Sequence, residues 1–518
     1  MSSRFERAID LLGEALRRSS SFRSWLRSRR WCGESLGMRT EVAVKDRVLL
    51  AEAGNEAVVL FLAVAKEPKV AVPLHIPLSI SSVRLDPDAF DLAVGSERFF
   101  VTEAEGRESY ARFLVDGFRR GAKLRTHAGD TLTFRGESLG AYRSLSPPMG
   151  GASSNLLSGI ATTDREVMFK SYKLLDPGNR EPAILERLHR RRFPHVPRFL
   201  GEISLGRGKE RLVLGVATER LEADDLFTWL TEGWSAVLSH PPSAGSDFEG
   251  TSLDLAGALG EATAALHEAL IDRRPGPFRV ETFSPKDAQA AYRGAMSNLE
   301  DSLRILARYS KEAARVEPNL AIRSREILFD HRKAIEELLG SLEDSVGTPK
   351  SVTHADLHLG QVLRSTPDGH LCFIDFEGEP ERAVGQRSVK LPPLRDVATM
   401  NRSFSYVTQT VWRESLTGGV TAPLRMMDRQ SLPAGNRSVA ERLLVWETEA
   451  MVRFSRRYLA CSMFYRELRL EEAFQAIRGW MMEKALYELR YELKHRPHNF
   501  MIPLEGVVSL ATGKAFVS

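Results

Sequence analysis

The chain has 518 residues, more than one hydrophobic core can serve, so roughly two to four packed domains are expected. Its 72 basic and 68 acidic residues give a net charge of +4, and so small and dispersed an excess argues against a nucleic-acid-binding groove. The three cysteines lack CxxC spacing, which argues against a disulfide framework and a zinc site. The longest apolar run, at 57–65, is too short for a membrane span. Together these features favour a cytoplasmic protein.

The N-terminal part of the chain predicts a small domain of helices and strands. Residues 3–18 carry apolar side chains at helical spacing, which predicts an amphipathic helix. From 40 to 100 the pattern becomes strand-like, with two β-rich runs separated by Gly-Asn. We interpret residues 1–105 as a separate cap subdomain.

The next stretch, 106–221, predicts mainly strands with one helix. "SSNLLSGIATTDREVMFKSYK" is typical of a hairpin, and "EPAILERLHRRRF" of a helix that begins at Pro182. "ERLVLGVATERL" predicts a further strand. From 222 to 518 helical patterns dominate, interrupted by a Pro/Gly/Ser-rich stretch at 240–250 that predicts an exposed loop. This order indicates a bilobal α+β protein, whose cleft would be a natural ligand site.

The stretch "THADLHLGQ" at 353–361 contains the strongest chemical signal. Phosphoryl transfer needs a carboxylate at the acceptor hydroxyl, ligands for Mg²⁺ and a cation at the nucleotide phosphates. In kinases the first two come from an H-x-D sequence with an amide side chain five residues after the aspartate. His354, Asp356 and Gln361 have these relative positions. By itself, H-x-D is also common in ordinary polar loops, where the histidine is structural.

A second acidic motif, "IDFEGEP", makes the kinase interpretation more specific. Asp375 lies nineteen residues beyond Asp356, at the end of the apolar run "LCFID". This is how a kinase presents its metal-binding aspartate. Glu377 would share a face with Asp375 if both were on a strand, and it would then complete the Mg²⁺ ligands. Otherwise Glu377 is a solvated turn carboxylate.

The phosphate-binding cation is expected on a strand of the first lobe. Lys170 and Lys173 have opposite parity, so only one can face the cleft, and periodicity does not choose between them. Glu181 and Glu186 are both available as the acidic partner. No GxGxxG sequence, which would form a phosphate-binding loop, precedes the lysines. The backbone amides of "GGASSN" at 150–155, which includes Ser153 and Ser154, would then bind the ATP phosphates.

The helix predicted at 483–495 carries two kinds of face. Leu486, Leu489 and Leu493 form a core stripe. A second face combines acids with aromatic rings, as sugar-binding sites do, although a solvated face of Glu–Lys pairs would have the same spacing. Its members are Lys484, Tyr487, Glu488, Tyr491 and Glu492, with Arg496 as a weaker candidate. Arg395, Asp396 and Arg402, in "PLRDVATMNRSF", are interpreted as supports of the active-site loops.

The motifs "THADLHLGQVL", "IDFEGEP" and "PLRDVATMNRSFSY" resemble those of the maltokinase family, whose members have an aminoglycoside-phosphotransferase-like, protein-kinase-like fold. The similarity extends from "WLRSRRWCG" in the cap, through "FKSYKLLDPGN" and "LGEATAALHEAL", to the helix at 483–507. The resemblance implies a cap at 1–105, a nucleotide-binding lobe at 106–221 and a helical lobe at 222–518 that carries the catalytic loop and the sugar-binding helix.

The resemblance also implies roles for single residues. Lys170 would bind the ATP phosphates, Asp356 would be the base, and Gln361 and Asp375 would bind Mg²⁺. Adenine would contact the segment from Glu219 to Leu221. The chain departs from the family pattern in three places. Ala355 replaces a glycine, which we expect to be chemically mild; Ala183 replaces a helix glutamate, which moves the ion pair to Glu181; and "WCGE" replaces W-F-G-G.

The leading hypothesis is therefore an ATP- and Mg²⁺-dependent maltokinase that makes maltose 1-phosphate. Another sugar such as glucosamine is the alternative acceptor, since close relatives phosphorylate it. A catalytically silent binding protein is disfavoured because Asp356, Gln361 and Asp375 are all present. We interpret His354 as a brace of the loop and place His358 near the acceptor. An association with a maltose-producing enzyme such as trehalose synthase is conceivable, and the oligomeric state is open.

Overall fold

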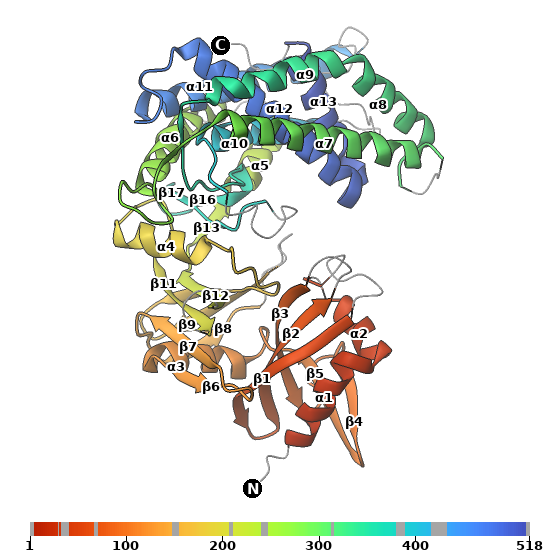
Figure 1. Cartoon of the computed structure of the whole chain (residues 1–518), viewed down its shortest axis with the longest axis vertical. Coiled ribbons are helices and arrows are strands. Elements are labelled where there is room, and N and C mark those ends of the chain that lie inside the picture. Colours follow the sequence, from red (N-terminus) through yellow and green to blue (C-terminus); the bar gives the residue numbers. More distant parts are fainter. Residues whose placement is uncertain are drawn as a thin grey trace. The chain divides into compact units, whose positions relative to one another are not determined.

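A computed structural model of the chain describes residues 5–29, 31–32, 41–66, 71–147, 155–206, 211–239, 247–311, 315–379, 389–415 and 432–513. The chain forms two compact units (Figure 1). The first comprises residues 1–189 and 197–221, and the second comprises residues 190–196 and 222–518.

The first unit begins with a five-stranded antiparallel sheet in the order β1-β2-β3-β5-β4, against which two helices pack. The helices bury Leu12, Leu16 and Phe22 against Val59 and Phe61 of the sheet, so their amphipathic pattern is satisfied here. The helix predicted at 3–18 is confirmed, with its start at Glu6. The elements are α1 (Glu6–Arg18), α2 (Ser20–Arg27), β1 (Glu41–Ala53), β2 (Glu56–Lys66), β3 (Ala71–Ser81), β4 (Phe90–Val94) and β5 (Glu97–Glu103).

A seven-stranded sheet completes the first unit, in the order β6-β7-β11-β12-β10-β9-β8. The predicted hairpin and the strand that follows it are confirmed as β9, β10 and β12, and the helix begun by Pro182 as α4. Helix α3 was not among the predicted elements; its Phe118 packs edge-on against Phe134 of the sheet. The elements are α3 (Glu108–Arg120), β6 (Lys123–Arg125), β7 (Thr131–Gly136), β8 (Tyr142–Leu145), β9 (Leu156–Thr162), β10 (Glu166–Ser171), α4 (Glu181–Arg190), β11 (Phe199–Leu205) and β12 (Leu212–Glu219).

The second unit is mainly helical, and α12 lies at its centre, packed against α7, α10 and α13. Most of α12 is buried, including Trp480, Leu486 and Leu489. The long helix α7 begins at a capping box formed by Ser284 and Asp287, with proline at its first position. The helices are α5 (Leu226–Ser239), α6 (Phe248–Ala269), α7 (Pro285–Tyr309), α8 (Pro318–Asp330), α9 (Arg332–Gly340), α10 (Leu394–Ser415), α11 (Ala434–Cys461), α12 (Leu470–His495) and α13 (Met501–Ala511).

Two small sheets in the second unit hold the loops between its helices. The first has the order β13-β16-β17, and the second pairs β14 with β15. The strands are β13 (Ala223–Asp225), β14 (Glu281–Thr282), β15 (Pro349–Lys350), β16 (Val362–Ser365) and β17 (Leu371–Phe373). The segment 353–361 lies between β15 and β16, so strands anchor it on both sides.

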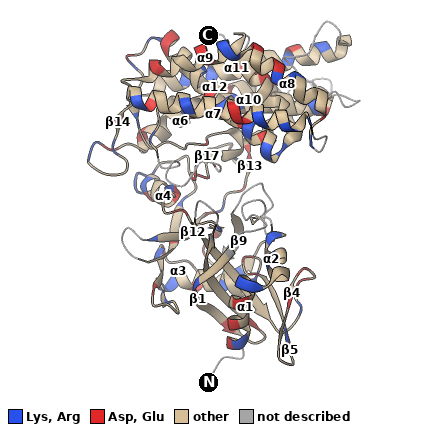
Figure 2. Cartoon of the chain, turned by 45° about the vertical axis from the view of Figure 1, so that its right-hand side comes forward, with Lys and Arg blue, Asp and Glu red and all other residues tan. Residues whose placement is uncertain are grey.

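Surface features agree with the composition. Figure 2 shows Lys and Arg interspersed with Asp and Glu along the helices of the second unit. The three cysteines are free, as their spacing predicts. The predicted loop at 240–250 is described only from residue 247, and there the chain enters α6 at Phe248 instead of continuing as a loop. Among the described residues, no helix is long and apolar enough to cross a membrane.

Candidate active site

Strand β10 carries a lysine that is paired with a carboxylate from the next helix. Lys170 Nζ donates a hydrogen bond of 2.8 Å to Glu181 Oε2, and both side chains are largely buried. Tyr172 donates from its hydroxyl to the same oxygen, at 2.5 Å. Because two donors converge on one buried oxygen, the direction of the lysine side chain is well defined.

The two alternatives that the sequence left open are resolved by these contacts. Lys173 points to the other face of the chain and pairs with Glu105. Glu186 lies 3.8 Å from Arg135 and not beside the lysines. The pair in this part of the chain is therefore Lys170 with Glu181.

The other predicted nucleotide contacts are Glu219, Leu221, Ser153 and Ser154. Glu219 ends β12, and its N–H donates to the carbonyl of Arg198 at 2.9 Å. Leu221 is the last residue of the first unit. Ser153 and Ser154 lie outside the described residues, so the expected phosphate cover stays a prediction.

In the second unit, a buried carboxylate of α10 holds the segment that carries the H-x-D sequence. Asp396 accepts hydrogen bonds from the backbone N–H of His354, at 2.8 Å, and of Ala355, at 3.0 Å. Nε2 of His267, from α6, lies 3.1 Å from the same carboxylate. Burial alone would raise the pKa of Asp396, but these partners outweigh it and lower the pKa. Asp396 therefore stays ionised and fixes the loop.

His354 lies beneath this loop with its side chain fully buried. Its Nε2 donates to the carbonyl of Ile374 at 2.9 Å, and its ring packs against Phe376. The histidine thus ties the H-x-D segment to the segment that carries Asp375, as expected of a structural brace.

Ala355 adopts a left-handed backbone conformation, with φ of 69°. Glycine reaches this region without strain, whereas a residue with a Cβ does so at a cost of about 1 kcal/mol. The replacement of a family glycine by Ala355 is therefore chemically mild but conformationally strained. Asp396 and Arg395, which bond the N–H and the carbonyl of Ala355, hold it in place.

Asp356, the predicted base, is paired with a lysine from α12. Lys484 Nζ lies 3.0 Å from Asp356 Oδ1 and 2.8 Å from Glu379 Oε1. Burial by itself lowers the pKa of Lys484, but the two carboxylates more than compensate and raise it. Lys484 is therefore a permanent cation that orients Asp356. The sequence placed Lys484 at the acceptor without anticipating this contact with the base.

Gln361 and Asp375, the predicted Mg²⁺ ligands, are in contact. Gln361 Nε2 donates to Asp375 Oδ2 at 3.1 Å. Asp375 has a positive φ of 63°, which is sparsely populated by residues other than glycine and typical of functional loops. A carboxylate and an amide are oxygen donors of the type that Mg²⁺ prefers, so these two side chains fit the ion.

Glu377 was expected to share a face with Asp375 if both lay on a strand, and that condition is not met. Strand β17 ends at Phe373, before either acidic residue, and residues 376 and 377 form a turn. Carboxylate oxygens of Asp375 and Glu377 nevertheless lie within 4.8 Å of each other, a separation that one metal ion could bridge. Whether Glu377 binds a metal stays a prediction.

Arg395 connects the loop to α12 through two buried carboxylates. Its guanidinium donates to Glu379 at 2.8 Å and to Glu483 at 3.0 Å. Lys484 also bonds Glu379, so one chain of alternating charges runs from Asp356 to Glu483. Glu379 and Glu483 were not predicted as site residues, although both lie within motifs that the sequence brings out, "DFEGEP" and "EKALYELRYELKH".

The predicted acceptor face of α12 is mostly buried and paired, not a solvated face. Glu488 pairs with Arg402 at 3.0 Å, and Glu492 with Arg496 at 2.6 Å. The rings of Tyr487 and Tyr491 stack, with centroids 6.2 Å apart and an angle of 18° between the planes.

Burial also shifts the pKa values of two glutamates and one histidine in this region. It raises the pKa of Glu488, and it raises the pKa of Glu492 to about 7. His358 is half-buried, and burial lowers its pKa although Asp356 opposes the shift. Two of these carboxylates therefore carry a desolvation cost that a cation would relieve.

Replacement of Asp396 by alanine should destabilise the protein strongly. The variant leaves two buried backbone N–H groups unpaired, and each costs roughly 1–3 kcal/mol. We therefore expect a loss of roughly 2–6 kcal/mol in the free energy of unfolding, measured by urea denaturation. The matched control is Asp368→Ala in the exposed turn before β17, with an expected loss of about 1 kcal/mol or less. Equal losses in the two variants would contradict the role given to Asp396.

The raised pKa of Glu492 predicts a pH-dependent stability. The folded protein retains this proton up to about pH 7, whereas the unfolded chain releases it near pH 4.5. The contribution of Glu492 to stability therefore declines as the pH rises from 4.5 through 7. Relative to the wild type, Glu492→Gln should be more stable at pH 8 than at pH 5, as measured by thermal unfolding. A difference that does not vary with pH would refute this assignment.

Comparisons with known proteins identify the family and the fold. A family model described as the phosphotransferase enzyme family matches residues 145–419. The chain is 27% identical over 187 residues to the glucosamine kinase of Mycolicibacterium smegmatis (strain ATCC 700084 / mc(2)155), which covers 36% of this chain and 41% of that protein. It is 26% identical over 237 residues to the glucosamine kinase of Streptacidiphilus jiangxiensis, covering 46% and 48%. These matches span less than half the length of both relatives.

Solved structures resemble the whole chain more extensively. A glucosamine kinase structure (crystal form B) has a TM-score of 0.61 at 19% identity and covers 93% of this chain and 95% of that one. A glucosamine kinase in complex with glucosamine, ADP and inorganic phosphate has a TM-score of 0.59 at 18% identity, covering 94% and 98%. The predicted fold class, that of the kinase-like aminoglycoside phosphotransferases, is confirmed. Because the family model matches more than half of the 518 residues, the chain belongs to the phosphotransferase enzyme family.

Proposed function

We propose that the protein is an ATP-dependent sugar kinase that transfers the γ-phosphoryl group of ATP directly to a hydroxyl of the acceptor. The observation that carries the proposal is the loop at 353–361, which the buried Asp396 holds at His354 and Ala355, and whose Gln361 bonds Asp375. Its side-chain types are those that phosphoryl transfer requires, and a buried ion pair fixes the position of its carboxylate.

Each residue has a defined part in this reaction. Asp356 accepts the proton of the acceptor hydroxyl, and Lys484 keeps the Asp356 carboxylate oriented. Lys170, held by Glu181, neutralises charge on the ATP phosphates. Gln361 and Asp375 would hold Mg²⁺, which supplies charge neutralisation at the transferred group when it is bound.

An amino sugar such as glucosamine is the acceptor that we favour. The two curated relatives with the sequence matches given above are glucosamine kinases. Acidic side chains are numerous in this part of the second unit, and such surroundings suit a cationic acceptor. The carboxylates that form ion pairs there are Asp356, Glu379, Glu483, Glu488 and Glu492.

Maltose is the second candidate acceptor. It rests on the resemblance of the motifs to the maltokinase family, and the stacked pair of Tyr487 and Tyr491 would suit the apolar faces of a longer sugar. The comparisons favour glucosamine over maltose. An association with trehalose synthase stays a prediction.

An assay of ADP release over a panel of sugars tests the proposal and the acceptor together. We expect Mg²⁺-dependent turnover that is fastest with glucosamine and slower with maltose and glucose. Asp356→Asn should lower kcat by about 10²–10⁴-fold, because it removes the base and leaves the fold intact. Asp368→Asn, on an exposed turn, is the control and should match the wild type. A folded Asp356→Asn protein with full activity would refute the mechanism.

The charge argument for the acceptor can be tested at Glu492. If the ionised form of this carboxylate favours a cationic acceptor, Glu492→Gln should raise KM for glucosamine by about tenfold, which corresponds to about 1.4 kcal/mol. The effect should appear above pH 7, where Glu492 has lost its proton. The KM for a neutral sugar such as glucose should change little. Equal changes for both sugars would show that the ammonium group is not recognised by this charge.

A further inference from the structure

Strand β10 and the residues that continue it present two buried faces with different partners. Lys170 and Tyr172 bond Glu181 on one face. Ser171 and Lys173 bond Glu105 on the other, and the serine hydroxyl lies 3.0 Å from the carboxylate. Because successive side chains of an extended chain point in opposite directions, the position of the second face determines that of the first.

The second face contacts the five-stranded sheet of the first unit. Glu105 lies two residues beyond the end of β5. The backbone of β3 also pairs with residues that follow β10: His75 N–H donates to Lys173 O at 3.0 Å, and Leu175 N–H donates to Pro73 O at 2.8 Å. Nδ1 of His75 lies 3.0 Å from the carbonyl of Tyr172. Burial lowers the pKa of His75 to about 3, so this ring stays neutral.

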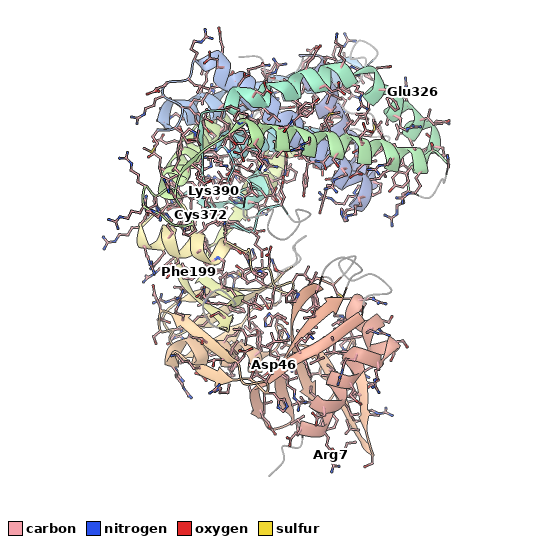
Figure 3. The ribbon with its side chains drawn as sticks, viewed as in Figure 1. Arg7, Asp46, Phe199, Glu326, Cys372 and Lys390 are labelled. Atoms are coloured by element: carbon pink, nitrogen blue, oxygen red, sulfur yellow. The ribbon has the colours of Figure 1, made fainter. Side chains whose placement is uncertain are left out.

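A second connection joins the five-stranded sheet to the seven-stranded sheet of the first unit. Asp46, on β1 and labelled in Figure 3, accepts a hydrogen bond of 2.8 Å from the N–H of Ala128, in the turn between β6 and β7. The N–H of His127 donates to the carbonyl of Arg47 at 2.9 Å. The two sheets are therefore held together both at the residues that follow β10 and at the turn between β6 and β7.

The Glu105–Lys173 pair is among the most enclosed ion pairs of the described residues. The side chains of Lys173 and Glu105 are 1% and 3% exposed, and the ammonium group lies 5.2 Å from the centre of the Trp31 ring. A buried pair of this kind seldom adds net stability, because desolvation offsets the attraction. What such a pair can provide is one preferred arrangement, since a displaced charge would be left unpaired in an apolar environment.

We propose that residues 1–105 position the phosphate-binding lysine. The Glu105–Lys173 pair, together with the pairing of β3 to residues 173–175, sets the orientation of β10 so that Lys170 and Tyr172 meet Glu181. Glu105 and Lys173 are thus positioning residues that act through β10. The inference rests on the proposed function, because it assigns Lys170 to the phosphates of ATP.

The test uses the full-length protein and separates positioning from simple destabilisation. Glu105→Gln and Lys173→Met each break the pair. The double variant Glu105→Leu/Lys173→Met replaces the pair by apolar side chains of similar size, an exchange that is often neutral or stabilising for the fold. The control is Glu56→Gln, which weakens the partly buried pair of Glu56 on β2 with Arg107, 2.9 Å long, a pair that involves no residue of β10.

We expect the single and double variants to lose about tenfold to a hundredfold in kcat/KM for ATP, because small misplacements of a binding group have effects of this size. The KM for the sugar should stay within about twofold. Hydrogen exchange should become faster in residues 166–175 of the pair variants and remain unchanged there in Glu56→Gln. The double variant should lose catalytic efficiency even where its melting temperature equals that of the wild type.

A folded double variant with the wild-type KM for ATP and wild-type exchange in 166–175 would overturn the inference. Loss of activity in Glu56→Gln equal to that in the pair variants would do the same, since the effect would then follow general destabilisation. Failure of the proposed function is recognised separately: the wild type would then turn over ATP with none of the sugars. The exchange measurements would still decide in that case whether the pair orders β10.

Discussion

The candidate active site of the second unit depends on one buried carboxylate. Asp396, on α10, accepts the backbone N–H groups of His354 and Ala355 and lies beside His267 of α6. Its hydrogen bonds hold a left-handed turn that an alanine would not adopt unaided. The direction of Asp356, the next residue along, follows from that turn. A buried charge that bonds the residue before Asp356 therefore sets the direction of the proposed base.

Helix α12 also contributes charged side chains that pair with residues of other segments. Lys484, Glu488 and Glu492 follow one another at intervals of four residues along one side of the helix, and Arg496 directly follows its last residue. The first two pair with residues of other segments, Lys484 with Asp356 and Glu379 and Glu488 with Arg402. Buried charges need such partners because desolvation is costly. The helix thereby ties the loop at 353–361 and α10 together.

The sequence predicted many of the elements and the candidate residues because these signals are local. The spacing of Asp356, Gln361 and Asp375 can be recognised from the sequence alone. The same is true of the hairpin at 156–171 and of the apolar stripe of α12. Helix α3 was missed, and the sequence left open whether Glu377 lies on a strand or in a turn. The end of a strand depends on packing as much as on pattern.

The sequence by itself pointed to the reaction type that we propose, since residue identity and spacing carry that information. The tertiary structure decided which side chains pair. Parity showed that Lys170 and Lys173 face opposite ways, but only the positions of Glu181 and Glu105 assign each lysine to its partner. Glu379 and Lys484 are 105 residues apart, yet they meet across a buried contact of 2.8 Å. Such pairs arise from long-range packing and from the cost of leaving a buried charge unpaired, and neither leaves a trace in local sequence.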